Sequence, residues 1–148
     1  MSRSPIQTEE SIRISEVTKR TGITSRTLRY WEEIGLLESI EGPVGTERRY
    51  HPDILDLIST VRTLQSSLGF SLTEIKALVD TDRTFARVKS LLRAEPTEQE
   101  RKEALLHASE VNRALISRLV DRNQAINRLL EERLKKQARL EELIKETS

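Results

Sequence analysis

The segment GITSRTLRYWEEIGLL, residues 22–37, has the pattern of a short helix that follows a tight turn. Gly22 suits the left-handed residue that ends a preceding helix, for which Ser15 is the expected N-cap, and Thr24 suits the N-cap of the second helix. Gly35 is expected to end that helix. Two short helices joined by a glycine-containing turn predict a helix-turn-helix.

The second helix brings arginines next to aromatic side chains. In a helix-turn-helix, the first residues of the second helix meet base edges in the major groove of DNA. Arginine can donate two hydrogen bonds to guanine, and hydroxyl groups can reach bases or phosphates. Leu28 and Trp31, three residues apart, are expected to pack inward. The alternative is that the arginines form only a solvated helix face. The expected DNA contacts in this region are Lys19, Thr24, Ser25, Arg26, Thr27, Arg29 and Tyr30.

A second basic and aromatic group follows a turn signal. Gly42-Pro43-Val44-Gly45 predicts the turn of a small β-hairpin, or wing. Arg48, Arg49 and Tyr50 come directly after it and are expected to contact DNA as well. Further helices are predicted from Pro52 to Gly69, from a capping box at Ser71–Glu74, and over residues 85–93.

The last third of the chain, residues 97–148, contains neither glycine nor proline. Thr97 and Glu100 form a second capping box, so one helix of roughly 70 Å is expected. Its apolar residues recur with nearly heptad spacing, and no other part of the chain is expected to cover them. A second copy of the chain is the simplest partner. The predicted dimer seam contains Leu105, Ala108, Leu115, Leu119, Ile126, Leu129, Leu130 and Leu134.

Composition narrows the class of protein. The chain has 148 residues, of which 33% are charged and 3% aromatic, and its net charge is +1. Four basic residues and no acidic one lie between Lys19 and Arg29. The chain has no cysteine, which excludes disulfides and thiolate metal sites. No apolar run is long enough to cross a membrane and no signal peptide is evident, so we expect a cytoplasmic protein with no membrane partner.

The motifs RTLRYWE, GLL, RRY and LGFSLTEI occur in this order over residues 12–79, which resemble the N-terminal winged-helix domain of the MerR family of bacterial transcription regulators. The resemblance implies a dimer held by a long C-terminal helix that pairs antiparallel with its twin. It also implies distortion of a promoter with an overlong spacer so that RNA polymerase can use it.

The resemblance also implies roles for particular residues. Arg26, Thr27, Arg29 and Tyr30 fall on the recognition helix, Arg48 and Arg49 on the first wing, Ser15 near a phosphate at the start of the first helix, and residues 66–70 on the second wing. Metal- and redox-sensing members use cysteines near the dimer helix, which this chain lacks. Drug-sensing members carry a ligand domain after that helix, and such a domain beyond Ser148 is left open.

We therefore expect a mainly α-helical protein with a flexible tail (1–11), a winged helix-turn-helix domain (12–80), a short connecting helix (81–96) and a long dimerisation helix (97–148). The expected function is a homodimeric regulator that binds an inverted repeat. The alternative is a coiled-coil adaptor that uses the winged helix as a DNA or nucleoid anchor. No catalytic constellation, cofactor site or metal-spaced cluster is present, and His51 and His107 are isolated in sequence.

Overall fold

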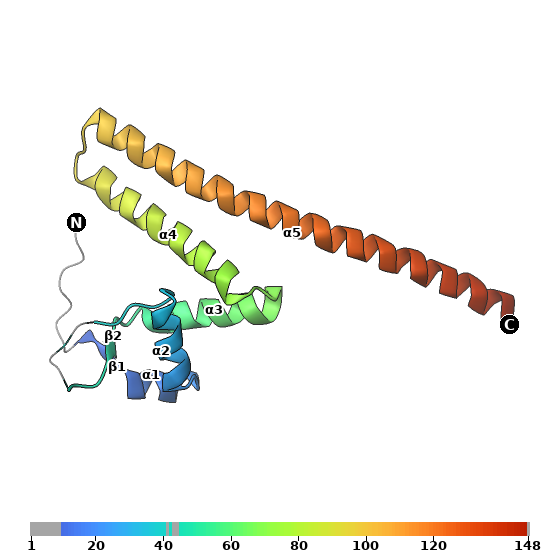
Figure 1. The fold of residues 1–148 in the computed structure, drawn as a ribbon, viewed down its shortest axis with the longest axis horizontal. Helices are drawn as coiled ribbons and strands as arrows, with labels where there is room; N and C mark the ends of the chain where they lie inside the picture. Colours follow the sequence, from blue (N-terminus) through green and yellow to red (C-terminus); the bar gives the residue numbers. More distant parts are fainter. Residues whose placement is uncertain (1–9, 41, 43–44, 148) are drawn as a thin grey trace.

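The computed structural model describes residues 10–40, 42 and 45–147, and it is mainly helical (Figure 1). A small N-terminal unit of short helices is followed by two long helices that form a hairpin. The predicted fold class is therefore confirmed. Most of the expected tail, residues 1–9, lies outside the described residues. The elements are β1 (Ile12–Arg13), α1 (Ile14–Thr21), α2 (Ser25–Glu33), β2 (Arg49–Tyr50), α3 (Ile54–Leu68), α4 (Leu72–Arg93) and α5 (Glu98–Thr147).

The turn between α1 and α2 is the one that the sequence predicted. Gly22 ends α1 with a left-handed φ of 75°, and the Thr24 hydroxyl accepts a hydrogen bond from the Thr27 N–H at 3.2 Å. The prediction that Ser15 caps α1 is wrong, because the helix begins at Ile14 without a side-chain cap. The Ile14 N–H instead donates to the Arg48 carbonyl at 2.9 Å, so β pairing satisfies the start of the helix.

The β structure differs from the expected hairpin. Strand β2 pairs antiparallel with β1, with Ile12 opposite Tyr50 and Arg13 opposite Arg49. The arms of the predicted hairpin meet at a bridge between Ile40 and Arg49. Residues 41, 43 and 44 of its turn lie outside the described residues. The segment before α1 pairs with β2 in addition to the Ile40 arm, and it supplies the regular strand, a partner that sequence neighbours could not reveal.

A small apolar core fixes α2 within the N-terminal unit. Leu28 and Trp31 are buried, as predicted, and they belong to one core cluster with residues of α1, α3 and α4. Burying each large apolar side chain contributes about 1.5–3 kcal/mol, so this face of α2 is firmly held and its other face stays outward. The core also contains Ile14, Val17, Ile23, Leu36, Leu37, Tyr50, Ile54, Ile58, Val61, Ile75 and Val79.

Helix α4 is longer than predicted. Its capping box at Ser71 and Glu74 is confirmed, but the helix runs without a break to Arg93, so the separate helix over residues 85–93 is wrong. No glycine or proline interrupts α4, and the hydroxyls of Thr81 and Thr84 bond back to carbonyls one turn earlier.

Helix α5 begins at the predicted capping box and extends well beyond the rest of the molecule. Thr97 and Glu100 exchange hydrogen bonds at 3.2 and 3.1 Å. The helix has 50 residues, which corresponds to about 75 Å. Its first half runs back alongside α4, and its second half projects past α3 (Figure 1). None of the helices in the described ranges is long and apolar enough to span a bilayer.

Helix α4 covers part of the stripe that was assigned to the dimer. Ala108 is only 8% exposed and Leu115 is half-buried, and both lie on the face of α5 that is turned towards α4. The prediction that Ala108 belongs to the dimer seam is corrected, since its own chain packs against it; for the half-buried Leu115 it stays a prediction. A different face remains open. The exposed large apolar residues of α5 are Leu105, Leu106, Ile116, Leu119, Val120, Ile126, Leu129, Leu130, Leu134, Leu140, Leu143 and Ile144.

Candidate nucleic-acid interface

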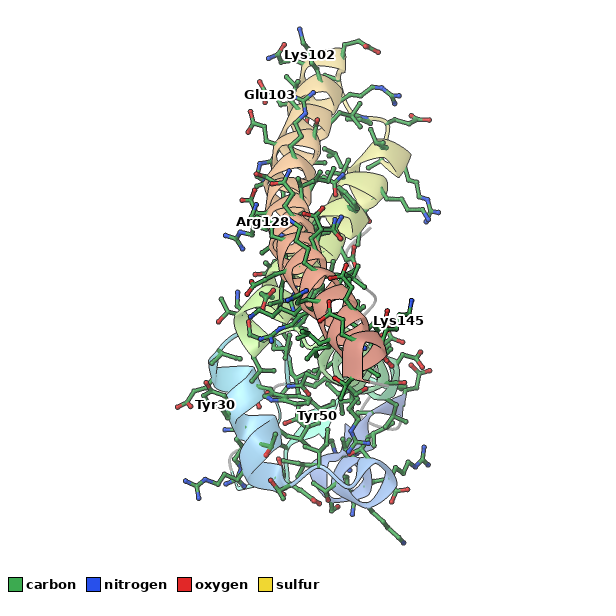
Figure 2. The ribbon with its side chains drawn as sticks, turned by 90° about the vertical axis from the view of Figure 1, so that its right-hand side faces the viewer. Tyr30, Tyr50, Lys102, Glu103, Arg128 and Lys145 are labelled. Carbon is green, nitrogen blue, oxygen red and sulfur yellow. The ribbon has the colours of Figure 1, made fainter. Side chains whose placement is uncertain are left out.

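The outer face of α2 carries the predicted DNA-contacting side chains. Arg26, Arg29 and Tyr30 are exposed, and Tyr30 projects away from the N-terminal unit (Figure 2). These side chains border an open hollow. Arg48, the residue before β2, also lines it. The hollow is lined by Ser25, Arg26, Thr27, Arg29, Tyr30, Glu32, Glu33 and Arg48. It combines guanidinium groups, hydroxyls and an aromatic ring, which together suit phosphates and base edges.

The two threonines at the start of α2 first of all build the cap. Thr24 accepts from the Thr27 N–H, and its hydroxyl donates to the Thr27 hydroxyl at 3.0 Å. A capped helix N-terminus is rigid and carries a partial positive charge, which favours nearby phosphate. The cap therefore presents Arg26 and its neighbours from a fixed backbone.

Glu32, which the sequence analysis did not single out, joins α2 to the β structure. Its Oε2 accepts from the Arg48 guanidinium at 2.5 Å and from the Tyr50 hydroxyl at 3.3 Å, while its Oε1 accepts from the Ser39 hydroxyl. The ion pair holds Arg48 against the recognition helix and offsets part of its charge. Three acceptor contacts from separate segments make Glu32 a positioning residue for this interface.

Tyr50 does not belong to the surface. Its side chain is fully buried in the core; in Figure 2 it is labelled in the middle of the N-terminal unit, whereas Tyr30 points outward. Burial, together with the neighbouring Glu32 charge, raises the pKa of Tyr50 to about 12. The prediction that Tyr50 contacts DNA is wrong, because alternation along β2 turns it inward and leaves Arg49 on the other side.

The remaining predicted contacts are not among the residues that line the hollow. Lys19 is exposed on α1, and the half-buried Arg49 donates to the Ser11 hydroxyl at 3.1 Å. The Ser15 N–H donates to the Glu47 carboxylate at 3.0 Å. Hydrogen bonds from the Ser15 side chain and backbone lower the pKa of Glu47, so a negative charge sits beside the predicted phosphate contact. Contacts of Ser15, Lys19 and Arg49 with DNA stay predictions.

The far end of α2 is held by Arg83, another residue that the sequence did not reveal. Its guanidinium donates to the carbonyls of Gly35 at 2.8 Å and Leu36 at 2.7 Å. These carbonyls belong to the two residues that follow the C-cap of α2, Ile34, so Arg83 holds the segment that leaves the helix. No local pattern could link Arg83 to them, because it lies 48 and 47 residues away in sequence.

Histidine and carboxylate side chains make no cluster of metal-ligand size in the described part of the chain. His51 accepts from the Asp53 N–H at 3.0 Å and lies 3.1 Å from the Asp53 carboxylate. His51 thus takes part in the turn that starts α3.

Comparison with known proteins agrees with this geometry. The sequence model described as "MerR HTH family regulatory protein" matches residues 12–94. This chain belongs to the MerR family. Within it, the HTH-type transcriptional regulator YfmP of Bacillus subtilis is 37% identical over 103 residues, which cover 68% of this chain and 72% of YfmP. The HTH-type transcriptional regulator HmrR of Rhizobium leguminosarum is 35% identical over 108 residues, which cover 69% of this chain and 79% of HmrR.

Two further MerR-family matches are a curated relative and a solved structure. The HTH-type transcriptional activator SoxR homolog of Chromobacterium violaceum is 39% identical over 69 residues, and the match spans 47% of this chain and 45% of that protein. A solved structure of HiNmlR, described as a MerR family regulator lacking the sensor domain and bound to promoter DNA, covers 86% of this chain and 94% of its own at 19% identity and a TM-score of 0.42. The chain is thus a MerR-family, DNA-binding regulator of transcription.

Proposed function

We propose that this MerR-family protein acts as a homodimer that binds an inverted-repeat operator and distorts promoter DNA. The observation that carries the proposal is the uncovered apolar row along α5. Leu105, Ile116, Leu119, Leu130 and Leu134 are each between 39% and 59% exposed. They recur close to whole turns of the helix, so they share one face, to one side of the face that packs on α4.

A second α5 is the occupant that fits this row. An isolated chain would leave a long strip of leucine and isoleucine in water, where it would favour aggregation. Covering each of these side chains contributes about 1.5–3 kcal/mol at most, so several together can offset the entropy lost on association. The apolar row runs along most of α5, so the α5 of a second copy of the chain is long enough to cover it.

Antiparallel pairing explains the unequal surroundings of the two halves of α5. The first half is flanked by α4, whereas the second half, beyond about Arg122, is exposed on every side in the described residues. An antiparallel partner lays its first half along this second half, and the two DNA-binding units then lie at opposite ends of the pair. Two α2 helices related by a twofold axis suit two inverted half-sites.

The action on the promoter follows from contacts at both outer ends of the operator. Each subunit offers the α2 face together with Arg48, and the centre of the site stays untouched. Smooth bending of a site of this kind costs of order 1–6 kcal/mol, which the outer contacts must offset. The distorted promoter is the form that RNA polymerase would use, so the polymerase is the further partner proposed.

The dimer is tested by comparing Leu130→Asp with Ser117→Asp. Both changes add one negative charge to exposed positions of α5, but Ser117 lies well round the helix from the apolar row. We expect Leu130→Asp to sediment as a monomer and to lose specific DNA binding, because a charge in a dry seam costs several kcal/mol. Ser117→Asp should remain dimeric.

Two results would contradict the proposal. An intact Leu130→Asp dimer in sedimentation would remove Leu130 from the seam. A monomeric variant that still binds a full operator as tightly as the unaltered protein would show that pairing is not needed, and would favour an adaptor whose helix binds another protein.

A further inference from the structure

Three arginines each hold the C-terminal end of an earlier helix. Arg62 of α3 donates to the Thr21 carbonyl at the end of α1. Arg83 of α4 holds the end of α2, as described above. Arg122 of α5 donates to the carbonyls of Leu68 and Gly69, both at 3.0 Å, at the end of α3. Helix C-termini expose unpaired carbonyls and carry a partial negative charge. A guanidinium donates hydrogen bonds to the carbonyls, and its positive charge is attracted to the negative end of the helix.

Arg122 ties the long helix to the turn between α3 and α4. Besides the two carbonyls, its guanidinium forms an ion pair with Glu74 and lies 4.5 Å from the centre of the Phe70 ring. Glu74 at the same time accepts from the Ser71 N–H at 3.1 Å, so it belongs to the cap of α4. These bonds from Ser71 and Arg122 lower the pKa of Glu74 and keep it charged for the pair.

Arg83 continues the connection to the recognition helix. It lies on α4, whose first turn carries the Glu74 that pairs with Arg122, and it donates to the backbone just after α2. Asp80, one turn earlier on α4, lies 3.3 Å from its guanidinium. A rigid helix therefore links two arginine contacts, one to α5 and the other to the end of α2.

Polar contacts of this kind fix orientation as well as distance. Apolar packing between α4 and α5 tolerates small sliding and rotation. A guanidinium, by contrast, is planar and donates in fixed directions, so it holds neighbouring carbonyls in one geometry. Arg122 is the point at which α5 meets both the end of α3 and the cap of α4.

We propose that Arg122 and Arg83 are positioning residues that set the angle of the recognition helix relative to α5, and thereby the operator spacing that the dimer accepts. The inference rests on the proposed dimer. In an antiparallel pair, the two recognition helices are connected through α5 of each subunit and its contacts with α4 and the end of α3. Any looseness at Arg122 or Arg83 therefore adds to the freedom of both helices and widens the range of half-site separations.

The test uses the full chain and an operator selected from random duplex DNA. The centre of that operator is then lengthened or shortened by one and two base pairs, and binding is measured for each spacing. The unaltered protein should prefer one spacing. The preference is the ratio of the affinity at the best spacing to the affinity at the neighbouring spacings. We expect Arg122→Ala and Arg83→Ala to reduce this ratio by about 2- to 30-fold, the range typical of residues that couple two sites.

Controls separate positioning from loss of stability. Arg128→Ala removes the same charge from an exposed position of α5 (Figure 2) and should keep the preference of the unaltered protein. Arg122→Lys keeps the charge but loses the planar guanidinium with its fixed donors. Its preference for one operator spacing should therefore fall between those of the alanine variant and the unaltered protein. Circular dichroism verifies that each variant is folded, and sedimentation verifies that it is dimeric.

The outcomes are distinct. If Arg122→Ala and Arg83→Ala weaken binding equally at every spacing, they act only through stability, and the inference is overturned. The same holds if their ratios equal that of the Arg128→Ala control. If the unaltered protein itself shows no preferred spacing and sediments as a monomer, the proposed dimeric function fails, and the positioning role fails with it.

Discussion

The two tyrosines should separate stability from DNA binding, because they lie in opposite environments. Tyr50 is fully buried, whereas Tyr30 is 51% exposed on the recognition helix. Changing either one to phenylalanine removes a hydroxyl and keeps the ring. The sequence grouped both as DNA contacts, so the pair of variants tests the correction directly.

The cost of Tyr50→Phe follows from the hydrogen bond between its hydroxyl and Glu32. The hydroxyl donates to Glu32 at 3.3 Å, which is long, and Glu32 keeps its contacts with Arg48 and Ser39 when the hydroxyl is removed. The variant therefore leaves no buried donor unpaired. We expect a loss of about 0.5–1.5 kcal/mol in the free energy of unfolding, the range for an ordinary hydrogen bond. Tyr50→Ala should cost about 3–5 kcal/mol, because it empties part of the core.

Tyr30→Phe should behave in the reverse way. Its unfolding free energy should stay within about 0.5 kcal/mol of that of the unaltered protein, as for most surface changes. Its affinity for the operator should fall by about three- to tenfold if the hydroxyl donates to a phosphate, as a single hydrogen bond implies. Urea unfolding gives the stabilities, and fluorescence anisotropy with labelled operator gives the affinities.

One result would refute the reasoning about the interior. If Tyr50→Phe weakened operator binding while its unfolding curve stayed unchanged, Tyr50 would have to reach the DNA. That outcome would mean that β2 turns its other face outward when DNA is bound.

Arg49→Ala should weaken binding to all sequences alike and make the dependence of affinity on salt shallower by about one, whereas Arg26→Ala or Arg29→Ala should cost about 1–3 kcal/mol mainly on the operator. Titration of binding on operator and random DNA over a salt series measures both, and an unchanged specific-to-nonspecific ratio for the two α2 variants would leave specificity to DNA shape. Because the pKa of Tyr50 is raised to about 12 from its ordinary 10, its contribution to stability should be complete below pH 10 and be lost as the pH rises towards 12. Ultraviolet difference spectra should show Tyr50 ionising only with unfolding; its ionisation in the folded state well below pH 12 would contradict its burial. Chemical probing of base stacking should reveal distortion at the operator centre without ligand, and zinc, copper or a thiol oxidant should not change it; a direct metal response would implicate His51 and His107.

Sequence by itself determined the features that depend on near neighbours. Gly22, Thr24 and the capping boxes at Ser71–Glu74 and Thr97–Glu100 act over three or four residues, so their spacing was enough to place helix ends. The same locality placed Leu28 and Trp31 on the inner face of α2 and the arginines on the outer face.

Only the tertiary structure decided which neighbour covers each remaining side chain. Periodicity gave α5 an apolar stripe, but it could not tell that Ala108 faces α4 while Leu130 stays open. Composition placed Tyr50 beside two arginines, yet pairing with Ile12 turns it into the core. Arg83 and Arg122 meet carbonyls some 50 residues away, a distance at which no sequence pattern specifies a partner. Such contacts form only when the helices pack, because packing brings each arginine next to carbonyls that are distant in the sequence.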